Sequence, residues 1–85
     1  MKLKDLVRGR EAKRILQYLL DTYEEEGEYK EFEVVGYYKE NGWFYCFDNS
    51  YNNCYVEQTR SLIIARKWCY GLADLDEMYP SGWND

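Results

Sequence analysis

The side chains of this 85-residue sequence that could take part in chemistry are three cysteines, three serines and sixteen acids, with no histidine. Histidine is the usual general base and the usual partner of a serine or cysteine nucleophile, so its absence argues against triad-type hydrolysis. The six glycines are isolated from one another, which argues against a phosphate-binding loop. We therefore predict a protein that is not an enzyme and needs no cofactor.

The three cysteines, Cys46, Cys54 and Cys69, lie inside apolar stretches of the sequence. A zinc site needs about four Cys or His ligands, usually including one close Cys-x-x-Cys pair. The closest two cysteines here are eight residues apart. We predict that all three are reduced, pack in the interior and bind no metal.

Acidic residues concentrate directly after the first twenty residues. Residues 1–20 have a net charge of +4 and residues 21–85 of −9, and seven of the thirteen residues from 21 to 33 are acidic. Four of these acids recur at i, i+3, i+4 and i+7, which places them on one side of a helix: Asp21, Glu24, Glu25 and Glu28. They stand at the C-terminal end of the predicted helix, where the macrodipole favours bases, so helix stability does not explain them. The pattern indicates either a surface for a cationic partner or a solvated face that keeps the protein soluble.

Helical spacing of apolar residues predicts a first amphipathic helix over about residues 4–26. Gly9 lies inside this segment, so the helix either continues through it or restarts at Arg10. Gly27 is the expected C-terminal cap.

Residues 31–40 alternate in polarity and are rich in aromatic and β-branched types, and residues 43–48 form an aromatic segment. The two segments flank Asn41-Gly42, which predicts a β-hairpin. A two-residue type I′ loop pairs Glu40 with Trp43 and Gly36 with Phe47. One side of this hairpin is expected to face the core and comprises Phe32, Val34, Tyr38, Trp43, Tyr45 and Phe47. The other side is expected to face outward and comprises Val35, Tyr37, Lys39, Phe44, Cys46 and Asp48.

The remaining segments predict a third strand over residues 54–59 and a helix from Ser61 that Gly71 caps. A further helical turn opened by Asp74 and Glu77 is expected to stop at Pro80. The predicted fold class is α+β: a single domain over residues 1–80 in αβββα(α) order, with helices packed on one face of a three-stranded antiparallel meander. Residues 81–85 are expected to form a flexible C-terminal tail.

The longest apolar run has five residues, whereas a membrane-spanning helix needs about 20. No signal-peptide core follows the first methionine. We therefore expect a cytoplasmic protein without a membrane partner.

Two resemblances bear on function. The order helix, three-stranded meander, helix is similar to that of double-stranded-RNA-binding domains, but their basic second-helix start is replaced here by Leu62-Ile63-Ile64. In size, acidity and aromatic content the chain resembles the small inhibitors that phages and mobile elements encode, such as anti-CRISPR and anti-restriction proteins. That resemblance implies a partner that handles nucleic acid.

The first hypothesis is accordingly a non-catalytic module that docks an acidic and aromatic surface on a basic, nucleic-acid-handling protein. The alternatives are a nucleic-acid-binding domain that uses the basic first half of the first helix, and a self-associating accessory protein that forms a homodimer. Direct nucleic-acid binding is disfavoured by the net charge of −5. The partner-binding residues predicted under the first hypothesis are Asp21, Glu24, Glu25, Glu28, Tyr29, Glu31, Glu33, Tyr37 and Phe44.

Overall fold

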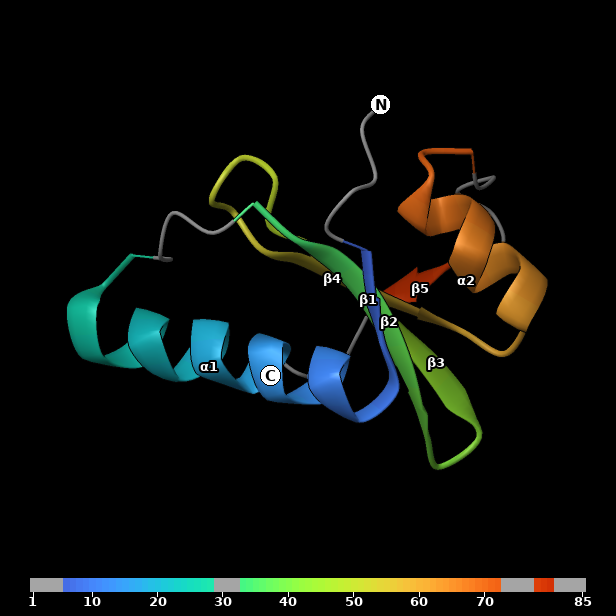
Figure 1. Cartoon of the computed structure of the whole chain (residues 1–85), viewed down its shortest axis with the longest axis horizontal. Coiled ribbons are helices and arrows are strands. Elements are labelled where there is room, and N and C mark those ends of the chain that lie inside the picture. The colour runs from blue at the N-terminus through green and yellow to red at the C-terminus, as the bar shows by residue number, and fades with distance from the viewer. Residues whose placement is uncertain (1–5, 29–32, 73–77, 81–85) are drawn as a thin grey trace.

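The structure is a computed structural model that describes residues 6–28, 33–72 and 78–80 (Figure 1). Within these residues, seven elements follow one another: β1 (Leu6–Arg8), α1 (Gly9–Glu26), β2 (Val35–Glu40), β3 (Trp43–Asp48), β4 (Tyr55–Thr59), α2 (Leu62–Cys69) and β5 (Tyr79–Pro80). The α+β class predicted from the sequence is confirmed.

The strands form one mixed sheet in the order β1-β2-β3-β4-β5. The predicted antiparallel meander is its centre, β2-β3-β4. Two short edge strands extend it: β1 pairs parallel to β2, and β5 pairs antiparallel to β4. Pro80, expected to stop a helical turn, lies instead in β5, and proline is tolerated there because an edge strand leaves one row of N–H groups unpaired. Asp74, Glu77 and the tail lie outside the described residues.

The β2–β3 hairpin is confirmed in detail. Asn41 and Gly42 both have positive φ angles, 53° and 80°, as a type I′ turn requires. The register pairs Glu40 with Trp43 and Gly36 with Phe47 as predicted. Local turn chemistry therefore determines which side chains of the two strands share a face.

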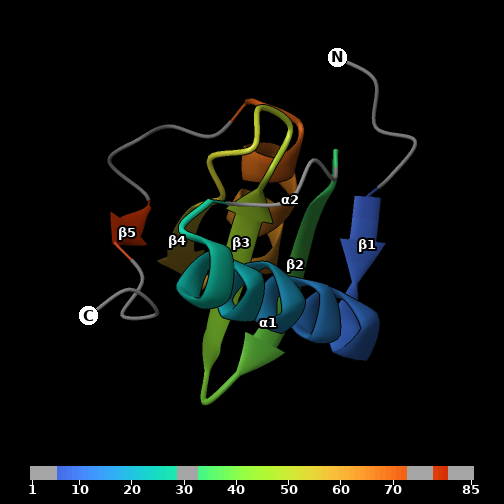
Figure 2. The same cartoon turned by 90° about the vertical axis from the view of Figure 1, so that its left-hand side faces the viewer.

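The two helices cover opposite faces of the sheet, which corrects the prediction that both pack on one face. Ala12, Leu16 and Leu19 of α1 pack with Val34 and Phe47. On the other face, the α2 residues pack with a separate group of sheet residues that includes Val35, Tyr37 and Cys46. Figure 2 shows α1 in front of the sheet and α2 behind it. The reason is that β3 is apolar on both faces, so each face needs its own cover.

The first helix begins at Gly9, whereas the sequence predicted a start near residue 4. Leu6 and Val7 before it form β1 and pack into opposite core clusters. Gly9 has a φ angle of +65°, which lets the chain turn from strand to helix and favours glycine at this position. The pairing of β1 with β2, rather than helix propensity, thus decides the conformation of this segment.

Gly36 explains why β1 fits so closely against β2. A Cβ atom at this position would lie 2.5 Å from Val7 Cγ2, 2.8 Å from the Val7 carbonyl oxygen and 2.9 Å from Phe47 Cζ. Real Cβ atoms do not approach so closely, so the missing side chain makes room for both neighbours.

The helix α2 has the caps that its sequence predicts. The Ser61 hydroxyl accepts a hydrogen bond from the Ile64 N–H at 3.3 Å. At the other end Gly71 has a φ of +75°, its N–H donates to the Trp68 carbonyl, and the Leu72 N–H donates to the Lys67 carbonyl. This pair of bonds is a Schellman motif, which satisfies carbonyls that the helix leaves open.

Candidate protein-binding surface

The C-terminal end of α1 carries the acids that the sequence singled out. Asp21, Glu24, Glu25 and Glu28 are all exposed, and so is Glu26 between them. Gly27 ends the helix with a φ of +77°, and its N–H donates to the Tyr23 carbonyl at 2.8 Å. Figure 1 shows this end of the helix reaching past the strands.

The overhang accounts for the exposure of the whole last turn. Thr22 is the last residue of α1 that is buried, and residues 23–28 are exposed on every side of the helix. The Thr22 hydroxyl donates to the Tyr18 carbonyl at 2.8 Å, a bond within the helix itself. Glu24, Glu25 and Glu26 therefore lie on a helical turn that the sheet does not cover, one turn beyond Asp21. Glu28 follows the Gly27 cap, so it does not continue the helical stripe that the sequence predicts.

The electrostatics of this segment oppose helix stability. Its last turn contains no base, and the sequence has none between Arg14 and Lys30. Glu24, Glu25 and Glu26 thus lie at the negative end of the helix dipole, which costs a few tenths of a kcal/mol for each charge in the last turn. The Gln17 side-chain amide donates to an Asp21 carboxylate oxygen at 2.9 Å, a neutral contact that leaves the charge in place.

Two tyrosines of α1 accompany the acids, and the sequence pattern did not single them out. Tyr18 is 50% exposed and Tyr23 is 45% exposed. Tyr23 continues the apolar stripe of Leu16 and Leu19 at helical spacing, so the pattern alone places it in the core. It is half-exposed because the helix has passed the edge of the sheet. We define the acidic end of α1 as Tyr18, Asp21, Tyr23, Glu24, Glu25, Glu26 and Glu28.

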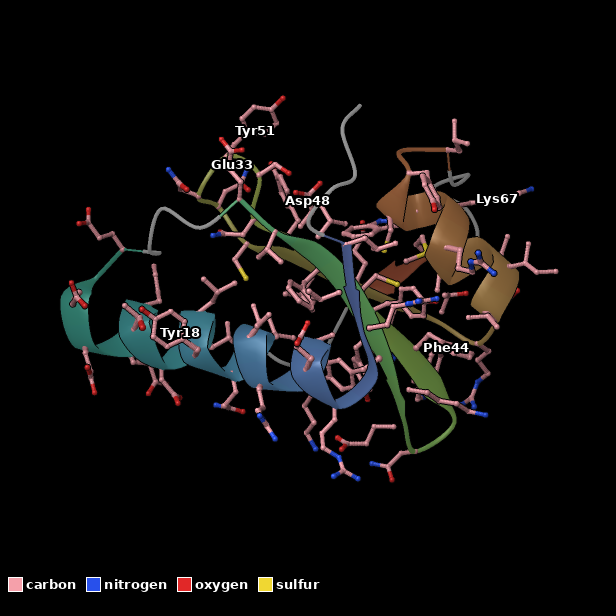
Figure 3. The ribbon with its side chains drawn as sticks, in the orientation of Figure 1. Tyr18, Glu33, Phe44, Asp48, Tyr51 and Lys67 are labelled. Carbon is pink, nitrogen blue, oxygen red and sulfur yellow. The ribbon has the colours of Figure 1, made fainter. Side chains whose placement is uncertain are left out.

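Two predicted aromatic residues do not face outward, which is a second correction. Tyr37 is 7% exposed and lies in the core cluster beneath α2. Phe44 is partly buried in the same cluster, and the Lys39 amino group lies 5.6 Å from the centre of its ring. Figure 3 shows Phe44 on the side of the sheet that α2 covers. The sequence predicts that both residues face solvent, because it places α2 on the other face of the sheet.

Of the three remaining predicted residues, the structure describes Glu33. Glu33 is exposed just before β2, and the carbonyl of the next residue, Val34, accepts a hydrogen bond from the Asn49 N–H at 2.8 Å. Glu33 therefore lies beside the loop that presents Tyr51, whose side chain is 85% exposed (Figure 3). Tyr29 and Glu31 lie outside the described residues.

The basic first half of α1 is also exposed. Arg10, Lys13 and Arg14 of α1 are exposed, as is Arg8 at the end of β1, and Lys13 forms an ion pair with Glu40 at the end of β2. An acidic neighbour within the chain thus contacts one of these bases, which reduces the positive surface that a phosphate backbone would meet.

The three cysteines are buried free thiols, and their predicted role in packing is confirmed. The pKa of Cys46 is raised far above its ordinary value. The main cause is a hydrogen bond with Cys69, and the second is the burial of the thiol. Burial, followed by the charge of Asp48, raises the pKa of Cys54 to about 12. The thiolates of Cys46 and Cys54 are therefore disfavoured at neutral pH, and these two thiols are poor nucleophiles. Within the described residues, no group of three or more acids and cysteines is arranged to hold a metal ion.

No similar protein provides information about this surface. Comparisons with models of known families, with curated proteins and with solved structures found no match. Across residues 6–28, 33–72 and 78–80, none of the helices has the length and apolar character needed to cross a membrane.

Proposed function

We propose that this chain is a non-catalytic protein-binding module whose acidic end of α1 docks on a basic surface of a partner protein. In its most concrete form the module is an inhibitor from a phage or mobile element, of the anti-CRISPR or anti-restriction kind, and the partner handles nucleic acid. The observation that carries the proposal is the exposure of five acids on and just after an overhanging helix end where the helix dipole favours bases.

The helix gives these carboxylates a fixed spacing. Residues four apart, such as Asp21 and Glu25, are separated by about 6 Å along the helix axis, because each residue rises about 1.5 Å. A row of negative charges on a rigid rod suits a partner surface whose arginines and lysines otherwise bind a phosphate backbone. Its field would also steer the two proteins together before contact.

The tyrosines supply the contact area that charges alone do not. Tyr18 and Tyr23 are half-exposed beside the acids, and tyrosine is enriched in interfaces because it offers a large, rigid surface with a polar end. Cation–π contacts between these rings and partner arginines would add to the charge pairs. The aromatic residues of the proposed interface are therefore Tyr18 and Tyr23 of α1, in place of the predicted Tyr37 and Phe44.

The decisive experiment compares two charge reversals on one helix. A partner is captured from lysate on the immobilised chain and identified, and its affinity is then measured for the unmodified chain, Glu25→Lys and Glu11→Lys. Both substitutions change the net charge equally at exposed positions of α1. We expect Glu25→Lys to weaken binding about tenfold or more and Glu11→Lys to weaken it much less.

Two results would reject the proposal. Equal effects of Glu11→Lys and Glu25→Lys would mean that net charge alone matters, as expected if the acids serve solubility. Tight binding of duplex nucleic acid by the unmodified chain, lost on reversal of Arg10 and Arg14, would favour the alternative that uses the basic first half of α1.

Rising salt should slow association with the partner if steering contributes.

A further inference from the structure

The outward side of α2 exposes several apolar residues where a surface helix is normally polar. Ile63 is 67% exposed and Leu72, just past the C-terminal cap, is 72% exposed; Leu62 and Tyr70 are exposed as well. The opposite side of the helix is also apolar, since Ala65 and Cys69 are fully buried against the sheet. The helix therefore has apolar residues both toward the core and toward solvent.

Folding does not account for the outward residues. Ile63 is β-branched and has a lower helix propensity than alanine or lysine. Leu72 is the residue after the cap glycine, which in a Schellman motif often packs back on the helix, but here it stays largely in solvent. Grouped exposed apolar residues on a small protein mark an interaction surface.

Bases accompany these apolar residues. Arg66 and Lys67 are exposed and stand at i+3 and i+4 from Ile63, on the same side of the helix as Tyr70. The sequence has no acid between Glu57 and Asp74. Glu57 accepts a hydrogen bond from the Trp68 indole N–H at 2.9 Å, on the inner side of the helix. We define the outer face of α2 as Leu62, Ile63, Arg66, Lys67, Tyr70 and Leu72.

The surface on this chain that complements the outer face of α2 is the acidic end of α1. One is basic and apolar, and the other is acidic and carries two half-exposed tyrosines. Figures 1 and 2 show that they lie on opposite sides of the sheet and at opposite ends of the molecule, so they cannot meet within one copy. Two copies can join them.

We propose that the protein self-associates head to tail, with the acidic end of α1 of one copy docked on the outer face of α2 of the next. Such a contact joins two different surfaces, so each complex keeps one surface of each kind free and can add further copies. The proposal shares the acidic end of α1 with the proposed function but does not depend on it. A basic partner protein would compete with the second copy for the same residues.

The test is the mass of the unmodified chain in solution. Sedimentation equilibrium at low salt should show an average mass that rises with concentration beyond the dimer, and high salt should shift the association toward monomer. A mass that stays at the 10.3 kDa of one chain at every concentration would overturn the proposal. That result would leave the proposed function intact, because partner binding is measured separately.

Charge reversals then assign the surfaces. Arg66→Glu with Lys67→Glu should abolish association, and so should the triple reversal of Glu24, Glu25 and Glu28 to lysine. An equimolar mixture of the two variants should associate again, because the reversed surfaces complement each other. Ile63→Ala, which leaves every charge in place, should weaken association by removing the exposed side chain.

The matched control reverses two exposed bases elsewhere. Arg10→Glu with Arg14→Glu makes the same charge change as the α2 variant but on the basic half of α1. Association should survive it. Loss of association in this control, with none in the α2 variant, would overturn the proposal in favour of two α1 helices paired antiparallel, basic half against acidic half. Circular dichroism of each variant confirms that the fold is retained.

Discussion

The helices α1 and α2 cover opposite faces of one sheet and differ in what they bury. α1 is eighteen residues long and places aliphatic side chains over Val34 and Phe47. α2 is eight residues long and fully buries small residues, Ala65 and Cys69, which pack with Cys46 of β3. The large buried side chains of the α2 face come instead from the sheet, as Val35 and Tyr37 show. The difference teaches that the helix supplies the bulky apolar groups on one face and the strands supply them on the other.

The two helices also differ in what they expose. α1 has a polar outward side and an acidic end beyond the sheet, whereas α2 exposes apolar residues together with two bases on its outward side. Neither the helix dipole nor helix propensity favours the residues of these two surfaces. We have therefore proposed a binding role for each of them.

The largest expected effect separates the two faces of the sheet. Phe47→Ala on the α1 face should lower the free energy of unfolding by about 3–5 kcal/mol, because Phe47 is completely buried and its ring would leave a cavity. Cys46→Ala on the α2 face should lower it by about 1 kcal/mol, since one atom is removed from a closely packed site. Urea denaturation measures both values. Equal losses would contradict the distinction between the faces.

A second variant tests the close approach of β1 on the α1 face. Gly36→Ala should lower the free energy of unfolding by about 1–3 kcal/mol, because the new methyl group would overlap Val7 and Phe47. Combining it with Val7→Ala removes one of these overlaps, so the double variant should lose less stability than the two single losses added together. Additive losses would show that the contact with Val7 is not the cause.

A pH dependence is expected from Cys54, a buried thiol of the α1-face cluster. Its pKa is raised to about 12 from an ordinary value of 9.0, so the folded chain keeps a proton that the unfolded chain loses between these values. Stability is therefore retained below about pH 9 and falls as the pH rises toward 12, by at most about 1.4 kcal/mol per pH unit. The measurement is urea denaturation at several pH values. Cys54→Ala should show a flatter profile, and an identical profile would refute the assignment.

The smallest effect compares the two ends of α1. Glu25→Lys should raise the free energy of unfolding by a few tenths of a kcal/mol up to about 1 kcal/mol, because it removes a repulsion from Asp21 and places a base at the C-terminal end of the helix. Glu11→Lys, in the first turn, should lower it by a similar amount. Thermal denaturation at low salt resolves such differences. A gain at position 25 together with weaker partner binding would show that the acid serves binding at the expense of stability.

Some features of this protein follow from the sequence alone. Asn41-Gly42 determines the hairpin and its register, since both residues must adopt positive φ and a two-residue loop leaves no freedom in pairing. Gly27 and Gly71 end their helices for the same local reason. The exposure of the acids near the end of α1 also follows, because charged residues stay in water.

Other features were decided by the tertiary structure. Period-two alternation shows that Tyr37 and Phe44 share a face, but not whether that face meets water, and α2 covers it from more than fifteen residues away in the sequence. The segment Leu6–Arg8 fits a helical pattern and becomes a strand because β2 offers it hydrogen-bond partners and Gly36 offers it space. Tyr23 fits the core stripe and is half-exposed because the sheet ends before the helix does. Each of these outcomes depends on contacts between distant segments, which local patterns do not contain.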